Sequence, residues 1–219
     1  MPNHTTTILE VCGNAESVKA FVAAIKTGRQ IKVNDYCDEL IDEYDFDVLL
    51  PMPEELKGVG CPVRIVSETA YKAAVAKLAQ GADKAFGLPI TQAMSDDYIA
   101  RFGCDNWYDW RHKNFGTKWG MYSVNFAGFS SDGEKATFSY DTAWSPASQY
   151  FLRISPKFPE LTFCHFFADE GGGFLGWEKF CNGECVEEQD LEWDSDEGIE
   201  LRERLGVYYP EDEEVEVEA

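Results

Sequence analysis

The densest group of side chains that could do chemistry lies between Cys104 and Gly120. Three tryptophans there alternate with amide, carboxylate and cationic residues, and a fourth follows at Trp144. Aromatic rings interleaved with hydrogen-bonding groups are typical of a small-ligand pocket. The same residues could instead clamp one part of the fold onto another, with Asp109 paired to Arg111 so that buried polar groups are satisfied. Both interpretations concern Asn106, Trp107, Asp109, Trp110, Arg111, Asn114, Lys118, Trp119 and Trp144.

Recognisable catalytic groupings are missing from the sequence. It has no Walker loop, no nucleophile elbow and no His-Glu-x-x-His, and the glycines at 171–173 form a turn between two strands with no helix N-terminus to cradle a phosphate. With three histidines only, acid–base work would fall to carboxylates, and Asp109 beside Arg111 and His112 is the one cluster to test. We therefore expect a binding protein rather than an enzyme, with no catalytic residue and no cofactor.

Cys164-His165 and Cys181-x-x-x-Cys185 could in principle form a Cys₃His zinc site. Adjacent strand residues point to opposite faces, so Cys164 and His165 cannot both reach one ion without a bulge. We therefore predict no metal site. The seven cysteines are odd in number and several lie in apolar runs, which is typical of reduced thiols. With a polar N-terminus and no apolar run near ~20 residues, this predicts a cytoplasmic protein.

Charge is the strongest compositional feature. The chain has 40 acidic and 19 basic residues, a net charge of −21, and residues 181–219 hold 16 of the acidic residues against two arginines. Such a field repels nucleic acid and anionic membranes and attracts basic surfaces. The excess is beyond the ~2–8 charges that solubility asks of a small domain, which indicates an electrostatic role. The residues assigned to partner binding are Asp35, Asp38, Glu39, Asp42, Glu43, Glu187, Glu188, Asp190, Glu192, Asp194, Asp196 and Glu197.

Carboxylates fixed on rigid elements could imitate a phosphate backbone. Our first hypothesis is a binding protein that blocks a basic, nucleic-acid-handling protein by occupying its groove. The alternatives are a small-ligand binder or enzyme that uses the aromatic cluster, and an assembly module that forms a homodimer through its sheet.

The elements that must position these residues form a βαββαβ pattern. Residues 6–12 read as a strand, Asn14 as the N-cap of a helix over 15–25, and Gly28 as that helix's C-terminal cap. Strands at 122–129 and 135–143 form a hairpin, Ser145-Pro146 opens a helix to Ile154, and strands follow at 161–168 and 174–180. The fold class is therefore α+β, with one ferredoxin-like sheet and both helices on one face.

A mostly helical insertion follows the first helix, at about 31–116. Helices are predicted at 68–80, 91–102 and 107–113, and residues 35–44 form a short helix or a loop. The domain spans 1–180 and the acidic C-terminal extension 181–219. We expect residues 210–219 to be disordered, with an edge strand as the alternative.

The chain resembles a known family in three motifs: Asn-Trp-Tyr-Asp-Trp-Arg at 106–111, Asn-x-Gly-Thr-Lys-Trp at 114–119 and Thr-Ala-Trp-Ser-Pro at 142–146. These, with Phe158-Pro159, the strand around Leu9 and the segment 50–54, resemble the YubB-like family of plasmids, prophages and phages. The resemblance covers about Ile8 to Trp177, and the acidic end beyond Cys181 lies outside it. It implies a ferredoxin-like domain and a mobile-element origin, hence a host protein as partner, and no reaction.

Overall fold

The computed structural model describes residues 3–34, 37–81 and 87–208. The chain forms two compact units, Met1–Leu50 with Phe115–Ala219 as the first and Pro51–Asn114 as the second. No helix among the described residues combines the length and the apolar character needed to cross a membrane.

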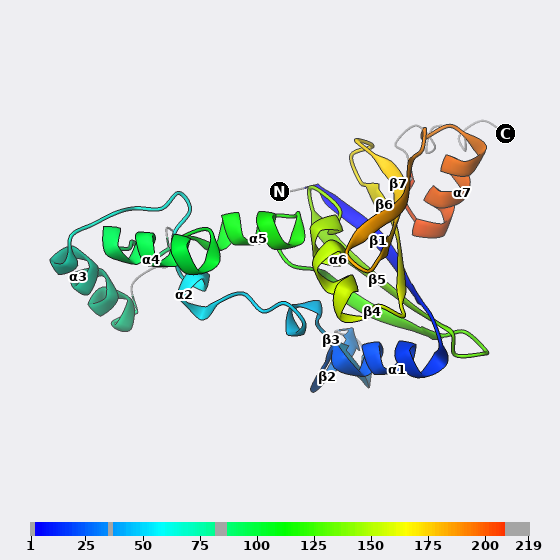
Figure 1. Ribbon diagram of the computed structural model, residues 1–219, viewed down its shortest axis with the longest axis horizontal. Helices are drawn as coiled ribbons and strands as arrows, with labels where there is room; N and C mark the ends of the chain where they lie inside the picture. The colour runs from blue at the N-terminus through cyan, green and yellow to red at the C-terminus, as the bar shows by residue number, and fades with distance from the viewer. Residues whose placement is uncertain (1–2, 35–36, 82–86, 209–219) are drawn as a thin grey trace. The chain divides into compact units, whose positions relative to one another are not determined.

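The first unit is built on a six-stranded antiparallel sheet (Figure 1). Its strands are β1 (His4–Cys12), β4 (Tyr122–Phe129), β5 (Lys135–Ala143), β6 (Thr162–Asp169), β7 (Leu175–Cys181) and β8 (Glu184–Asp190), in the order β4-β5-β1-β6-β7-β8. With α1 (Ala15–Ala24) and α6 (Ser148–Ile154), the first four strands of this sheet give the chain order β1-α1-β4-β5-α6-β6. This arrangement confirms the α+β, ferredoxin-like fold, to which β7 and β8 add two strands at one edge.

Strict alternation of side chains creates the main core. Every second residue of β1 is buried, and Leu9 and Val11 are fully so. The rings of Phe21 on α1 and Phe151 on α6 lie 5.3 Å and 5.6 Å from the ring of Phe163 on β6. The two helices therefore cover the same face of the sheet, as the sequence predicts.

The opposite face carries α7 (Asp196–Leu205). Leu201 and Leu205 of this helix pack with Ala168 and Leu175 in a small second core. The hydroxyl of Ser195 accepts a hydrogen bond from the Gly198 N–H at 3.0 Å and caps the helix. Figure 1 shows α7 beside β7, on the other side of the sheet from α6. The predicted C-terminal extension is thus ordered as β8 and α7, and its last ten residues lie outside the described residues.

A hairpin of β2 (Lys26–Asn34) and β3 (Cys37–Tyr44) follows α1. The predicted cap at Gly28 is wrong, because α1 ends at Ala24 with Ile25 as its C-cap, and Gly28 adopts φ +77° inside β2, at an irregularity in the strand pairing. Residues 37–44 are a strand rather than a helix or loop. Cations on β2 face carboxylates on β3, and these cross-strand ion pairs favour extended pairing. A 3₁₀ turn, η1 (Phe46–Val48), closes this segment.

The second unit is helical. It contains α2 (Glu54–Lys57), α3 (Glu68–Ala79), α4 (Gln92–Phe102) and α5 (Trp107–Phe115), the last residue of which belongs to the first unit. Ser67 and Thr91 cap α3 and α4, and Gly103 ends α4 at φ +75°. The predicted insertion at about 31–116 therefore divides into the hairpin, which is part of the first unit, and the helical unit 51–114.

The helix after β5 begins later than its sequence suggests. Instead of starting at Ser145-Pro146, α6 starts at Ser148, and the Ser145 hydroxyl donates to the Gly116 carbonyl oxygen at 2.7 Å. Ser145 thus serves a tertiary contact in place of a cap. The 3₁₀ turn η2 (Ser155–Lys157) then leads into β6.

Candidate functional site

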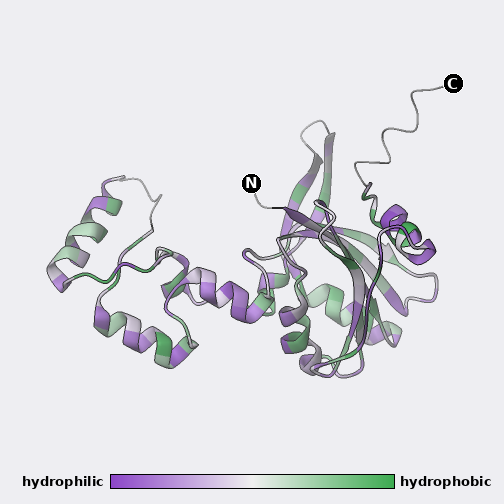
Figure 2. Ribbon diagram, turned by 90° about the horizontal axis from the view of Figure 1, so that it is seen from above, coloured by the Kyte–Doolittle hydropathy of each residue, from purple (hydrophilic) through white to green (hydrophobic). Residues whose placement is uncertain are grey.

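An acidic surface runs along β8, the turn after it and α7; we call residues 184–203 the acidic edge. All seven residues predicted here for partner binding, from Glu187 to Glu197, are exposed. The exposed carboxylates of the acidic edge number ten: Glu184, Glu187, Glu188, Asp190, Glu192, Asp194, Asp196, Glu197, Glu200 and Glu203. In Figure 2, α7 is mostly in the purple of hydrophilic residues, with a smaller green part.

The local structure explains why these carboxylates are tolerated. On the described residues β8 pairs with β7 alone, so it is an edge strand, and charged side chains are typical of edges because they prevent further strand pairing. Asp196 and Glu197 lie in the first turn of α7, where the helix dipole stabilises negative charge. One of the ten carboxylates, Glu187, forms an ion pair with Lys179, at 3.0 Å.

Two cavities border the acidic edge. One, of about 290 Å³, is lined by Glu178, Glu188 and Asp190 with Phe167, Trp177 and Gln189. The other, of about 270 Å³, lies between α7 and the sheet and is lined by Phe166, Trp177, Gln189, Leu191, Glu197, Glu200, Leu201 and Arg204. Carboxylates beside aromatic rings suit a guanidinium or ammonium group on an aliphatic stem.

The first predicted acidic cluster has a different character. Asp38, Asp42 and Glu43 on β3 form ion pairs with Lys32, Lys26 and Arg29 on β2, at 2.6 Å, 2.5 Å and 2.7 Å. The hydrogen bond from Lys26 holds the pKa of the Asp42 carboxyl below its usual value. Asp35 and the side chain of Glu39 lie outside the described residues. The hairpin thus pairs these three carboxylates with three cations, whereas the acidic edge holds ten exposed carboxylates and one arginine, Arg202.

The aromatic cluster is divided between the two units. In the second unit Asn106 caps α5: its side-chain oxygen accepts the Asp109 N–H at 2.9 Å and its amide donates to the Asp109 carboxylate at 2.7 Å. Trp110 is 5% exposed, Asn114 donates to its carbonyl oxygen at 2.8 Å, and the Arg111 guanidinium lies 5.6 Å from its ring centre. Half-buried Trp107 packs edge-on against Tyr108 at 5.6 Å. These contacts give the second-unit residues capping and packing roles.

The other three residues form an exposed group in the first unit. The Lys118 ammonium lies 5.1 Å from the ring centre of Trp119 and 5.8 Å from that of Trp144. Trp119 is 37% and Trp144 58% exposed. Trp144 also adopts φ +77°, a left-handed conformation that is costly for a residue with a side chain.

Sequence reasoning missed a buried polar chain between the sheet and α6. The Tyr140 hydroxyl lies 2.9 Å from His165 Nε2, and His165 Nδ1 lies 3.3 Å from Glu178 Oε2, which also accepts the Ser148 hydroxyl at 2.6 Å. His165 has no exposed surface. Burial raises the pKa of Tyr140 well above its ordinary value, so its hydroxyl keeps its proton inside this chain of hydrogen bonds. The alternation Phe163, His165, Phe167 could have indicated that His165 faces the core.

His165 and Cys164 face opposite sides of β6, as expected from strand geometry. Within residues 3–34, 37–81 and 87–208, no three His, Cys, Asp or Glu side chains are placed to hold a metal ion.

Comparison with known proteins identifies the relatives. Residues 111–216 match the family model described as the ferredoxin-like domain in Api92-like protein. The uncharacterized protein YubB of Escherichia coli (strain K12) is 33% identical over 98 residues, which cover 42% of this chain and 65% of that protein. The chain thus spans about 65% of the length of this curated relative. The crystal structure of a protein api92 from Yersinia pseudotuberculosis aligns with a TM-score of 0.46 at 10% identity, over 88% of this chain and 99% of that chain.

The family match corrects one expectation. It extends to residue 216, so the acidic edge lies inside the family's ferredoxin-like domain rather than beyond it. The chain therefore carries, over residues 111–216, the ferredoxin-like domain of Api92-like proteins, and over 98 residues it is similar to YubB.

Proposed function

We propose that this protein is a non-enzymatic binding protein whose acidic edge docks on a basic, nucleic-acid-handling protein and blocks its nucleic-acid groove. The observation that carries the proposal is the set of ten exposed carboxylates on one edge strand and the helix after it. The acidic edge holds one basic residue, Arg202, and the next along the chain, Arg204, pairs with Glu10 on β1 at 2.8 Å. The negative charge of the acidic edge is therefore available to a partner.

The geometry supports imitation of a phosphate backbone. Alternate residues of a strand lie about 6.8 Å apart on one face, which equals the rise of two nucleotides along one DNA strand. Glu188 and Asp190 have this spacing on β8, opposite Glu178 and Gly176 of β7. Because β8 is hydrogen-bonded into a sheet, its carboxylates are held in place before binding, which lowers the entropy lost on association.

The partner that we propose is a host protein, because the family resemblance points to a phage or plasmid origin. Blocking a nucleic-acid-handling defence protein is the consequence expected for the host. Charge complementarity would make association fast and strongly dependent on ionic strength.

The test is capture of host proteins on the immobilised chain, with a charge-matched control. One variant carries Glu188→Gln, Asp190→Asn and Glu192→Gln on the acidic edge, and the other carries Asp38→Asn, Asp42→Asn and Glu43→Gln on the hairpin. Both remove three negative charges, but the hairpin carboxylates are already paired. We expect a basic protein to bind wild type and the hairpin variant, and to bind the acidic-edge variant at least ~10-fold more weakly, a loss of about 1.4 kcal/mol.

The captured protein then competes for a labelled DNA or RNA duplex. Release of the duplex by the wild-type chain, weakened by added salt, supports the mimic. Equal loss of capture in both variants would show that net charge alone matters. A complex that persists in 1 M salt, or that holds the duplex and the chain together, would contradict groove occupancy.

A second candidate function is supported by the exposed pair Trp119 and Trp144 around Lys118. Two rings and an ammonium group suit a planar aromatic anion, and the left-handed Trp144 is strain of the kind that binding sites retain.

Two substitutions of Trp144 separate the cost of its left-handed backbone from its contribution to ligand binding. Because glycine adopts positive φ without penalty, Trp144→Gly should be about 1 kcal/mol more stable than Trp144→Ala. Both variants should lose tryptophan quenching by adenosine 5′-monophosphate, the probe. Quenching that is absent in wild type, or retained in Trp144→Gly, would exclude this function; urea denaturation measures the stability difference.

A further inference from the structure

Two cysteines share the sheet face opposite α1 and α6. Cys12 is the last residue of β1, and Cys164 lies on β6 next to it. In the register of β1 and β6, Cys12 faces Thr162 and Glu10 faces Cys164, so the two thiols occupy diagonal positions on one face. Both are half-buried, so reagents in solution can reach them.

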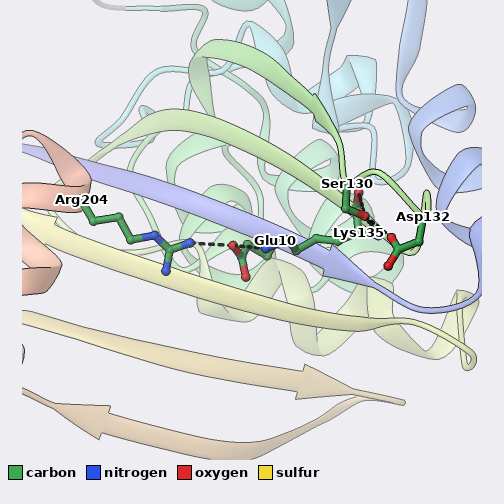
Figure 3. A network of polar contacts seen from close by, with 5 residues as sticks. All are labelled: Glu10, Ser130, Asp132, Lys135 and Arg204. Atoms are coloured by element: carbon green, nitrogen blue, oxygen red, sulfur yellow. Dashed lines mark hydrogen bonds and ion pairs between the residues drawn. The ribbon is translucent and has the colours of Figure 1, made fainter.

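Lysines flank the pair on both sides. Lys135 on β5 lies directly across from Cys12, and Lys179 on β7 directly across from Cys164. Glu10 lies between them and contacts Lys135 at 3.0 Å and Arg204 at 2.8 Å, as Figure 3 shows. Lys179 is paired with Glu187. Two lysines and one carboxylate therefore lie next to the thiols on this face of the sheet.

The pair divides its protons unequally. The hydrogen bond from Cys164 lowers the pKa of the Cys12 thiol to about 7, and Lys135 and Lys179 act in the same direction against burial and Glu10. The same hydrogen bond, together with burial, raises the pKa of Cys164. Cys12 is thus the thiol of the pair that ionises more readily, beside a Cys164 that keeps its proton, the arrangement that makes one cysteine of a pair reactive.

We propose that Cys12 is a site of reversible S-thiolation by low-molecular-weight disulfides, with Cys164 as the positioning residue that donates its S–H to the Cys12 sulfur. The Cys12 thiolate attacks one sulfur of a disulfide R–S–S–R. The Cys12–S–S–R bond forms, the original S–S bond breaks, and R–S⁻ leaves with the electron pair. A free thiol reverses the reaction by attacking the mixed disulfide.

The mixed disulfide is expected to persist rather than be resolved by Cys164. Diagonal positions on neighbouring antiparallel strands have Cα atoms about 7–8 Å apart, beyond the roughly 7 Å limit for a disulfide. The adduct places a bulky polar group at the end of β1, on the face that also carries α7.

The test uses the full chain with glutathione disulfide as the probe, and intact and peptide masses as the readout. We expect one glutathionyl adduct, on Cys12, with a rate that rises through pH 7, and slower reaction at exposed Cys185, whose pKa is raised by burial. Cys164→Ala removes the neighbour that lowers the Cys12 pKa, so less of Cys12 is thiolate at pH 7, while the higher nucleophilicity of that thiolate offsets part of the loss. The net expectation is adduct formation about threefold slower at pH 7.

Cys164→Ser is the matched variant, because the serine hydroxyl can still donate to the Cys12 sulfur. The pH at which Cys12 reacts at half its maximal rate should stay lower in Cys164→Ser than in Cys164→Ala. Circular dichroism confirms that each variant is folded. Modification of Cys12 no faster than of Cys185, a pH midpoint unchanged in Cys164→Ala, or a Cys12–Cys164 disulfide in place of the adduct would each overturn the proposal.

Discussion

Replacing His165 by alanine is expected to lower the free energy of unfolding by about 4 kcal/mol, from the cavity left in the core and the buried hydroxyl left without a partner. The fully buried imidazole joins Tyr140 to Glu178 and lies 5.1 Å, between ring centres, from Phe151 on α6. A loss of this size is a large part of the ~5–15 kcal/mol that stabilises a typical domain. Urea denaturation followed by circular dichroism measures it.

A double-mutant cycle separates packing from hydrogen bonding. His165→Phe keeps a ring of similar size but leaves the Tyr140 hydroxyl unpaired, at a cost of about 1–3 kcal/mol. Adding Tyr140→Phe removes that hydroxyl, so the double variant should regain most of the loss. If the losses of unfolding free energy from the two single substitutions simply added in the double variant, the Tyr140–His165 hydrogen bond would not contribute to stability.

Much of the fold could be predicted because its signals are local. Alternation in β1, β5 and β6 and the caps at Asn14 and Ser67 lie within single elements. The hairpin β2–β3 could not be predicted, because charged residues fill its strands and no alternating apolar face marks them as extended. Ser145 misled because its hydroxyl bonds to Gly116, 29 positions away.

The site was less predictable because its chemistry depends on register. Glu10 and Cys164 are neighbours only through the β1–β6 pairing, and no local pattern indicates that two thiols and two lysines converge there. The acidic residues could be predicted from composition. Composition could not distinguish two kinds of carboxylate. Some, such as Asp42, are paired with a cation on the neighbouring strand, and others, such as Glu188, lie on the edge strand of the large sheet.

Adding one methyl group to β7 should detach the acidic edge from the sheet. A Cβ at Gly176 would lie 2.4 Å from the Gln189 carbonyl oxygen and 3.3 Å from the Asp190 Cα, both backbone atoms of β8. Because backbone cannot rotate away as a flexible side chain can, Gly176→Ala must push β8 outward. We expect about 1–3 kcal/mol of destabilisation, faster hydrogen exchange along β8, and capture of the basic partner reduced at least ~10-fold.

Gly58→Ala is the matched control, since its Cβ would meet no heavy atom within 4 Å beyond its neighbours in the chain, and its φ is −98°. It should change stability by no more than ~1 kcal/mol and leave exchange in β8 and partner capture unaltered. If Gly176→Ala accelerates exchange along β8 but the partner still binds at full strength, the carboxylates need not be held on the sheet. The proposal that a rigid edge strand imitates a phosphate backbone would then be wrong, even though the charge itself still attracts a basic protein.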